Sequence, residues 1–340
     1  MSNAWDANAR EVLIDTAAPG FAQLTIQDDG DGFTKDEFVR LMDGGIGNSE
    51  KRPRGEPLIN ERPTIGRLGI GMLGIAQICG GFSVTSCTAS GEAFRARIKL
   101  YDLIKEKLDR NDREVIRTAG GVDRTTEVDV GEYHIERNFD GTGLSKGTTI
   151  LADDVHPTFV HTFRETYTKP PVRWTDYIKQ TSKHHSIQEL GDYWRLLWEL
   201  GASCPIPYVS DDALPDRVCE VEQRRLKSYD FRVVVDGVEL RKPVRLQRNP
   251  GGYTVEVIAE ESHRVFGRDV RFHGYIVVQE GSQVRPDELR GVMLRVNEVG
   301  IGLYDPSMLD YRYNEGPRSR WVTSELFITA GLEDALNIDR

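Results

Sequence analysis

Alternating apolar and polar positions near the start of the chain predict a pair of β-strands. The stretch "FAQLTIQ" (residues 21–27) alternates as a strand with one buried face does, and "REVLIDT" (10–16) has a similar apolar centre. Between them lies "AAPG" (17–20), whose proline and glycine are typical of a turn. The pattern therefore predicts two strands joined by this turn.

The next stretches predict helices on either side of a long loop. "TKDEFVRLMD" (34–43) is a predicted helix, opened by a capping box in which Thr34 precedes Glu37 by three residues. "GMLGIAQIC" (71–79) has the apolar spacing of a second helix. The residues between, 44–66, are rich in Gly, Pro and charge without any period. Loops of this length in compact domains are usually functional lids or disordered segments.

Strand patterns return on both sides of a charged region. "GFSVTSCTA" (81–89), "AFRARIKL" (93–100) and "GTTILADDV" (147–155) are predicted strands. Residues 101–140 are highly charged and give no clear prediction. Residues 1–155 thus form the first predicted domain.

The rest of the chain divides into a bridge and a second domain. In the bridge, 156–228, apolar residues at helical spacing indicate core rather than a cofactor site: Trp194, Leu197, Trp198 and Leu200. The second domain, 229–340, shows strands with hairpin turns and a helix-forming stretch that ends in "GLEDALNIDR". The predicted fold class is α+β.

Composition narrows the class of protein. The chain has 340 residues, of which 39% are hydrophobic and 29% charged, which suits a soluble globular protein of two domains. No apolar run approaches the ~18 residues of a membrane span, and "MSNAWDANAR" (1–10) lacks the basic-then-apolar pattern of a signal peptide, so we expect a cytoplasmic protein without a membrane partner. The four cysteines lack metal or redox spacing and are predicted to be buried thiols. A net charge of −10 argues against nucleic-acid binding by bulk charge.

The acidic stretch "DDGDGFTKDEF" (28–38) admits a calcium loop, a hairpin turn or a nucleotide site. With Gly32 as the central glycine of an EF-hand loop, Gln27 and Phe38 occupy its two essential acidic ends, which excludes calcium. The hairpin remains open because Asp-Gly pairs commonly form turns. A turn alone, however, does not require two glycines at these positions after an aspartate that ends a strand.

Three further motifs bear on this choice. Asn3 and Asp6 lie at i and i+3 of one predicted helix, and a Gly66-x-x-Gly69-x-Gly71 motif follows the long loop directly before a helix. The strand 147–155 carries Thr148 directly after a glycine. Each feature alone has an ordinary explanation, such as helix capping for Asn3 and Asp6 or strand propensity for Thr148.

In this order the four motifs resemble the GHKL (Bergerat-fold) ATPases, the group of gyrase, the ninety-kilodalton heat-shock chaperone, histidine kinases and MutL. The resemblance covers residues 1 to about 155. It implies a Bergerat-fold α/β sandwich ATPase domain, and the part after 229 looks like the smaller transducer-like α+β domain of the gyrase, MutL and MORC-like branches. It implies ATP and Mg²⁺ as ligands.

The resemblance also implies roles for individual residues. Asp28 would accept a hydrogen bond from the adenine amine, supported by Thr148, and glycine motifs would let the backbone approach the nucleotide. Asn3 would supply an oxygen ligand to Mg²⁺. The implied nucleotide-binding set is Asn3, Asp6, Asp28, Gly30, Gly32, Ser49, Lys51, Gly66, Gly69, Gly71, Met72 and Thr148. A basic side chain of the second domain should also reach the γ-phosphate, and we expect Arg295 in this role, which no motif fixes.

One departure from the family concerns catalysis. The group's general base is a Glu one helical turn before the Asn of the first motif, and that position precedes residue 1. We therefore expect no catalytic residue in this chain, and expect it to be a fragment or to bind ATP without efficient hydrolysis.

The expected function is an ATP-binding switch or clamp that forms an ATP-dependent homodimer and hydrolyses ATP in its full-length form. A DNA-linked, a chaperone-like and a defence or signalling role stay open, and so does a nucleic-acid or client-protein partner. The alternative is a non-hydrolysing nucleotide-binding interaction module. A histidine kinase is disfavoured because those proteins place this domain at the C-terminal end.

Overall fold

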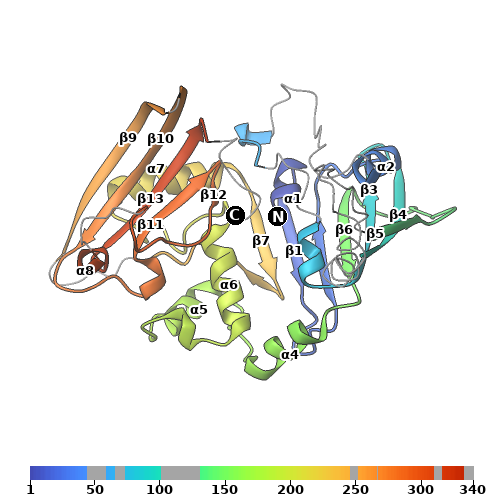
Figure 1. Cartoon of the computed structure of the whole chain (residues 1–340), viewed down its shortest axis with the longest axis horizontal. Helices are drawn as coiled ribbons and strands as arrows, with labels where there is room; N and C mark the ends of the chain where they lie inside the picture. Colours follow the sequence, from blue (N-terminus) through green and yellow to red (C-terminus); the bar gives the residue numbers. More distant parts are fainter. Residues whose placement is uncertain are drawn as a thin grey trace, which may run out of the picture.

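The computed structural model describes seven stretches of the chain, which together hold two β-sheets and the helices around them (Figure 1). The described residues are 1–43, 59–65, 73–100, 131–245, 252–265, 267–309 and 316–332.

The first sheet contains eight strands within the described residues. In spatial order they are β5 (Gly131–Ile135), β4 (Ala93–Leu100), β3 (Gly81–Cys87), β6 (Gly147–Ala152), β2 (Leu24–Asp28), β1 (Glu11–Asp15), β7 (Arg232–Val235) and β8 (Val238–Glu239). The predicted pair β1 and β2 is antiparallel, with Val12 opposite Asp28. β7 runs parallel to β1. The hairpin β7–β8, which falls in the segment expected as the second domain, therefore extends the first sheet.

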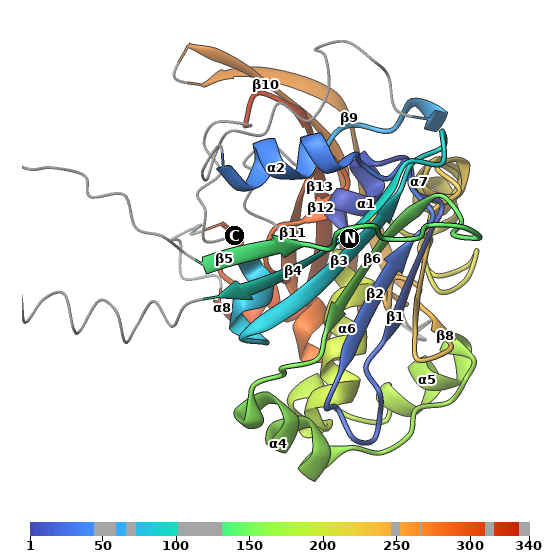
Figure 2. The same ribbon diagram turned by 90° about the vertical axis from the view of Figure 1, so that its right-hand side faces the viewer.

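Helix α2 (Lys35–Asp43) covers one face of this sheet (Figure 2). Its predicted capping box is confirmed, since the Thr34 N–H donates to the Glu37 carboxylate at 2.7 Å and the Glu37 N–H donates to Thr34 Oγ1 at 3.2 Å. Phe38 on the apolar side is fully buried, with its ring centre 5.2 Å from that of Phe94 on β4. This contact belongs to a small core that the strands β3, β4 and β6 share with α2.

The second sheet has five strands in the part of the chain that the structure covers. Their order is β12 (Val299–Gly300), β11 (Gly291–Val296), β13 (Val322–Ala330), β10 (Arg268–Gln279) and β9 (Tyr253–Val265). The sequence prediction missed β13, which lies at the centre. Most of its residues are buried on both faces. The strand therefore lacks the alternation of apolar and polar residues by which a half-exposed strand is recognised. The α+β class is confirmed.

Helices of the bridge lie against both sheets, and Figure 1 shows α5 and α6 below and between them. The bounds are α4 (Pro157–Thr166), α5 (Trp174–Thr181), α6 (Asp192–Ser203) and α7 (Asp216–Ser228). Trp194, Leu197 and Trp198 on α6 are buried, as predicted, and Leu200 is partly buried against the same core. They belong to one large core that also contains Val12 of β1 and Phe327 of β13, so the two sheets share a hydrophobic interior.

The remaining elements are short. They are α1 (Ser2–Asp6), α8 (Gly316–Ser319) and the 3₁₀ helices Ile59–Glu61, Leu73–Gln77, Ile187–Glu189 and Asp287–Leu289. The expected helix at 71–79 is thus described only as a 3₁₀ helix. Cys79, Cys87 and Cys204 are buried free thiols, as predicted. No helix in the described stretches is long and apolar enough to cross a membrane.

Candidate nucleotide site

Asp28 stands at the end of β2, where the strand passes into the glycine loop. Its Oδ1 accepts the Gly30 N–H at 2.9 Å, and its Cα pairs across the sheet with that of Thr148 on β6. Burial raises the pKa of the Asp28 carboxyl, although the backbone N–H groups of Gly30 and Thr148 partly offset this rise. The predicted partners Asp28 and Thr148 are therefore adjacent, and the loop fixes the orientation of the carboxylate.

The two predicted glycines of this loop lie where a side chain would collide with backbone. A Cβ on Gly30 would come within 2.7 Å of the Ala7 carbonyl oxygen. Gly32 has φ of +66°, and its Cβ would meet the Cys87 carbonyl oxygen at 2.3 Å. The loop is thus held between the end of α1 and the end of β3, and the Asp31 N–H donates to Ala7 O at 2.6 Å.

Helix α1 places the two residues of the first motif differently. Asn3 is exposed, whereas Asp6 is 8% exposed. The Asp6 Oδ1 accepts the N–H of Ile65 at 2.8 Å. Since Gly66 is the next residue along the chain, Asp6 fixes the backbone directly before the third motif.

The Thr148 side chain contacts a residue that the sequence did not reveal. Ser86 on β3 is buried, and its Oγ lies 3.5 Å from Thr148 Oγ1. The same Oγ accepts the N–H of Phe33 at 2.9 Å. Ser86 therefore joins β3, β6 and the glycine loop, but a serine inside a strand pattern carries no signal for such a role.

Asn8 and Arg62 were also missed. Asn8 has φ of 60°, its Nδ2 donates to Asp31 at 2.6 Å, and its Oδ1 accepts the Ile59 N–H at 3.1 Å. It thereby connects α1, the glycine loop and the segment 59–65. An asparagine just beyond the C-cap of a short helix is the signal that fits this left-handed position. Arg62 sits in an otherwise ordinary charged loop, which gives no sequence signal.

Half of the predicted set lies outside the described residues. These positions are Ser49, Lys51, Gly66, Gly69, Gly71 and Met72. The structure brings together Asp28, Gly30, Gly32 and Thr148, whereas Asp6 holds the backbone at Ile65 and Asn3 lies exposed at the start of α1.

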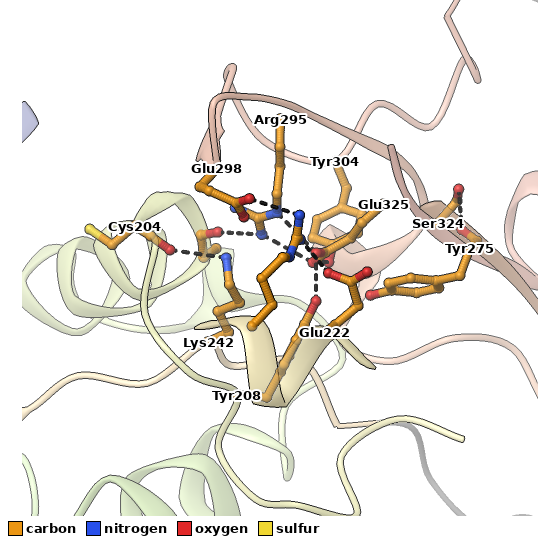
Figure 3. A network of polar contacts seen from close by, with 12 residues as sticks. Cys204, Tyr208, Glu222, Lys242, Tyr275, Arg295, Glu298, Tyr304, Ser324 and Glu325 are labelled. Carbon is orange, nitrogen blue, oxygen red and sulfur yellow. Dashed lines mark hydrogen bonds and ion pairs between the residues drawn. The ribbon is translucent and has the colours of Figure 1, made fainter. Parts of the chain in front are cut away.

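The structure does not bring Arg295 to this group, and Figure 3 shows where its side chain lies instead. The side chain on β11 is 0% exposed. Its Nε and Nη2 donate to Glu325 at 2.9 and 3.0 Å, and Nη2 also donates to the Ala202 carbonyl at 2.8 Å. Because a guanidinium enclosed in this way cannot touch a ligand, the expected role of Arg295 as a phosphate sensor is not supported.

Metal binding at this site would depend on few protein ligands. The described residues contain no cluster of three or more His, Cys, Asp or Glu side chains that could hold a metal ion. Asn3, with its exposed amide at the start of α1, fits an ion that takes its other ligands from phosphate and water.

Comparisons with known proteins address the same part of the chain. Residues 1–125 match the family model described as the histidine kinase-, DNA gyrase B- and HSP90-like ATPases. No curated protein sequence matches the chain. Among solved structures, the chain is similar to the ATPase region of Saccharomyces cerevisiae topoisomerase II bound to ICRF-187 (dexrazoxane). The likeness has 12% identity and a TM-score of 0.42, and it covers 97% of this chain and 71% of that one.

Proposed function

We propose that this chain, whose residues 1–125 match the model of the histidine kinase-, DNA gyrase B- and HSP90-like ATPases, binds ATP with Mg²⁺ and uses it as a conformational switch. The observation that carries this proposal is Asp28. It is a partly buried carboxylate at a strand end, oriented by the Gly30 N–H and facing Thr148 across the sheet.

Asp28 gives the site its selectivity for adenine. An ionised carboxylate only accepts hydrogen bonds, so it suits the exocyclic amine of adenine and opposes the carbonyl that guanine carries at the same position. A site built around such a group rejects the wrong base strongly, because its buried acceptor is then left without a donor.

Phosphate and metal binding are assigned to the other motifs. Gly66, Gly69 and Gly71 bring backbone N–H groups to the phosphates, and Ser49 and Lys51 contribute from the preceding loop. Asn3 holds Mg²⁺, which supplies positive charge to neutralise the triphosphate. Asp6 supports this region because it binds the Ile65 N–H, one residue before the glycine motif.

The shared interior of the molecule supports the switch part of this proposal. The core that includes Val12 next to the site continues through α6 to Phe327 of the second sheet. When nucleotide binding orders the first domain, packed side chains therefore transmit this conformational change to the second sheet. The clamp form of this proposal includes an ATP-dependent homodimer and attack of water on the γ-phosphate, which releases ADP and phosphate.

The experiment combines binding with turnover. Calorimetry with ATP and Mg²⁺ tests the site, and sedimentation with a non-hydrolysable ATP analogue tests dimer formation. Phosphate release at saturating ATP then separates an ATPase from a nucleotide-binding interaction module. Binding without either turnover or dimerisation would leave only the interaction module, and absence of binding would refute the proposal.

A further inference from the structure

Residues 62–65, which we name the strap, contact both α1 and the second sheet. The Pro63 carbonyl accepts a hydrogen bond from Trp5 Nε1 of α1 at 2.7 Å. The Thr64 carbonyl accepts one from Asn297 Nδ2 at 2.8 Å, and Asn297 follows β11 at the turn into β12. The Ile65 N–H donates to Asp6 at 2.8 Å. Within four residues, the chain is thus tied to two separate parts of the molecule.

Two of these hydrogen bonds belong to one peptide group. The carbonyl of Thr64 and the N–H of Ile65 are the two ends of a single planar unit, whose partial double bond prevents them from turning independently. Asn297 holds one end and Asp6 holds the other. A displacement of either partner therefore tilts the peptide against the other partner.

Arg62 anchors the strap. Its guanidinium is 3% exposed and donates to Ala9 O at 2.6 Å and, from Nε, to Tyr229 O at 3.0 Å. It also lies over the Trp5 ring, 4.7 Å from the ring centre. Tyr229 is the C-terminal cap of α7, so a cation stands at the negative end of that helix dipole.

A second route joins Arg62 to the same turn of the second sheet. The Tyr229 hydroxyl donates to Glu298 at 3.2 Å, and Glu298 also pairs with Arg225 of α7 at 2.8 Å. Asn297 and Glu298 have φ of 48° and 75°, so both residues adopt the left-handed conformation that shapes this turn. The strap and the turn 297–298 are consequently connected at two points, Thr64 and Tyr229.

We propose that Arg62 and Asn297 are positioning residues that couple the nucleotide site to the second sheet through the Thr64–Ile65 peptide. This inference rests on the proposed ATP site. Asp6 and the strap hold each other in place at Ile65, directly before Gly66, and Asn297 links the same peptide group to β11 and β12. Occupation of the site by a triphosphate stabilises the strap, and a turn that holds the strap in place favours triphosphate binding in return.

The test uses an isosteric change that removes one donor. Asn297→Asp replaces the amide N–H₂ with an oxygen, which cannot donate to Thr64 O, and Asp tolerates the positive φ. Asn138→Asp is the matched control, because Asn138 is exposed, has φ of 57° and lies in another loop. We expect Asn297→Asp to weaken ATP binding by about 2–12-fold, the range of one net hydrogen bond, and adenosine binding by less than about twofold. Asn138→Asp should change neither.

Hydrogen exchange distinguishes coupling from a merely structural role of Asn297, because a structural role alone would not change the effect of ATP on exchange in the second sheet. In the wild type, ATP should slow amide exchange in β2 and also in β11 and β13. In Asn297→Asp the slowing in β2 should persist while the slowing in β11 and β13 is lost. Equal slowing of the second sheet in both proteins, or equal losses of ATP and adenosine affinity, would overturn the coupling.

Arg62→Lys is the second variant, because lysine keeps the charge but not the fork that joins Ala9 and Tyr229. Arg62→Lys should also weaken ATP binding more than adenosine binding. Its loss of ATP affinity should exceed that of Asn297→Asp. If the wild type binds ATP and both variants keep its affinity and exchange pattern, the coupling is wrong while the ATP site stands. If the wild type does not bind ATP, both proposals fall together.

Discussion

Two regions of this protein bury acidic side chains, and they do so in opposite ways. At the glycine loop, burial raises the pKa of Asp28, and the described residues include no ion pair with its carboxylate. Beneath the second sheet, burial alone would raise the pKa of Glu325, but Arg295 and Lys242 overcome it and hold this pKa at about 2 (Figure 3). A partly exposed carboxylate that its neighbours do not neutralise is available to a ligand. One that is fully paired inside the core is part of the fold.

The second region is a closed network around Glu325. Tyr208 and Tyr304 donate to its carboxylate at 2.7 and 2.6 Å, beside the two bonds from Arg295. Lys242 is fully buried and donates to Cys204 O at 2.9 Å, and burial followed by the charge of Arg295 lowers its pKa to about 7. Perturbed pKa values therefore do not by themselves identify a functional site in this protein.

The largest expected effect is the loss of stability when this network is broken. Glu325→Ala leaves Arg295 buried without its carboxylate, and we expect a loss of about 3–5 kcal/mol in the free energy of unfolding. Chemical denaturation measures this change. Glu132→Ala, which removes an exposed partner of Lys99 at 3.7 Å, should cost less than about 1 kcal/mol. A fall in the ATP affinity of the folded Glu325→Ala protein would show that the network is not purely structural.

Gly32→Ala in the glycine loop should cause a smaller loss of stability. The added Cβ combines a positive φ with a contact of 2.3 Å to Cys87 O, so we expect a cost of at least about 2 kcal/mol in unfolding free energy. Gly91 is the matched control, since its φ is +85° but its Cβ would meet open space. Gly91→Ala should cost about 1 kcal/mol from its backbone alone. Equal costs at the two positions would mean that the contact with β3 is easily relieved.

Asp28→Asn should act on binding rather than on stability. The amide cannot replace the charged acceptor, so ATP and adenosine binding should both weaken by about 1–3 kcal/mol, measured by calorimetry. Asp140→Asn, in an exposed loop, should leave both affinities unchanged. Unchanged affinity in Asp28→Asn would remove the adenine assignment, and with it the contrast between the two regions.

The smallest effect is a pH dependence of the same site. Because burial raises the pKa of Asp28, protonation on acidification occurs at a higher pH than for an ordinary aspartate, and it removes the charged acceptor. Adenosine, which has no phosphates to titrate, should therefore bind more weakly as the pH falls towards that pKa. The Asp28→Asn protein should show a flat profile, and a parallel decline in both proteins would assign the titration to another group.

In the first region, the glycines that follow Asp28 at fixed spacing could be identified from the sequence because that motif is local. Thr148 lies far along the chain and was expected from the family resemblance, and the structure places it opposite Asp28. The roles of Ser49, Lys51, Gly66, Gly69, Gly71 and Met72 stay predictions, since these residues lie outside the described stretches. The second region could not be predicted, because Glu325 and Arg295 lie on separate strands and only the fold pairs them. Arg295 looked available for a phosphate only because no local pattern reveals a partner thirty residues away. The strap was missed for the same reason, since Arg62 and Thr64 meet Tyr229 and Asn297 only in the folded chain.

The central claim is that Asp28 makes this an adenine-nucleotide site, and a paired calorimetric titration of the unmodified chain with ATP and with GTP, both with Mg²⁺, tests it most directly. The account predicts that ATP binds and that GTP binds at least about 100-fold more weakly, because the guanine carbonyl faces the Asp28 carboxylate. Equal affinity for the two nucleotides, or no binding of ATP, would contradict it.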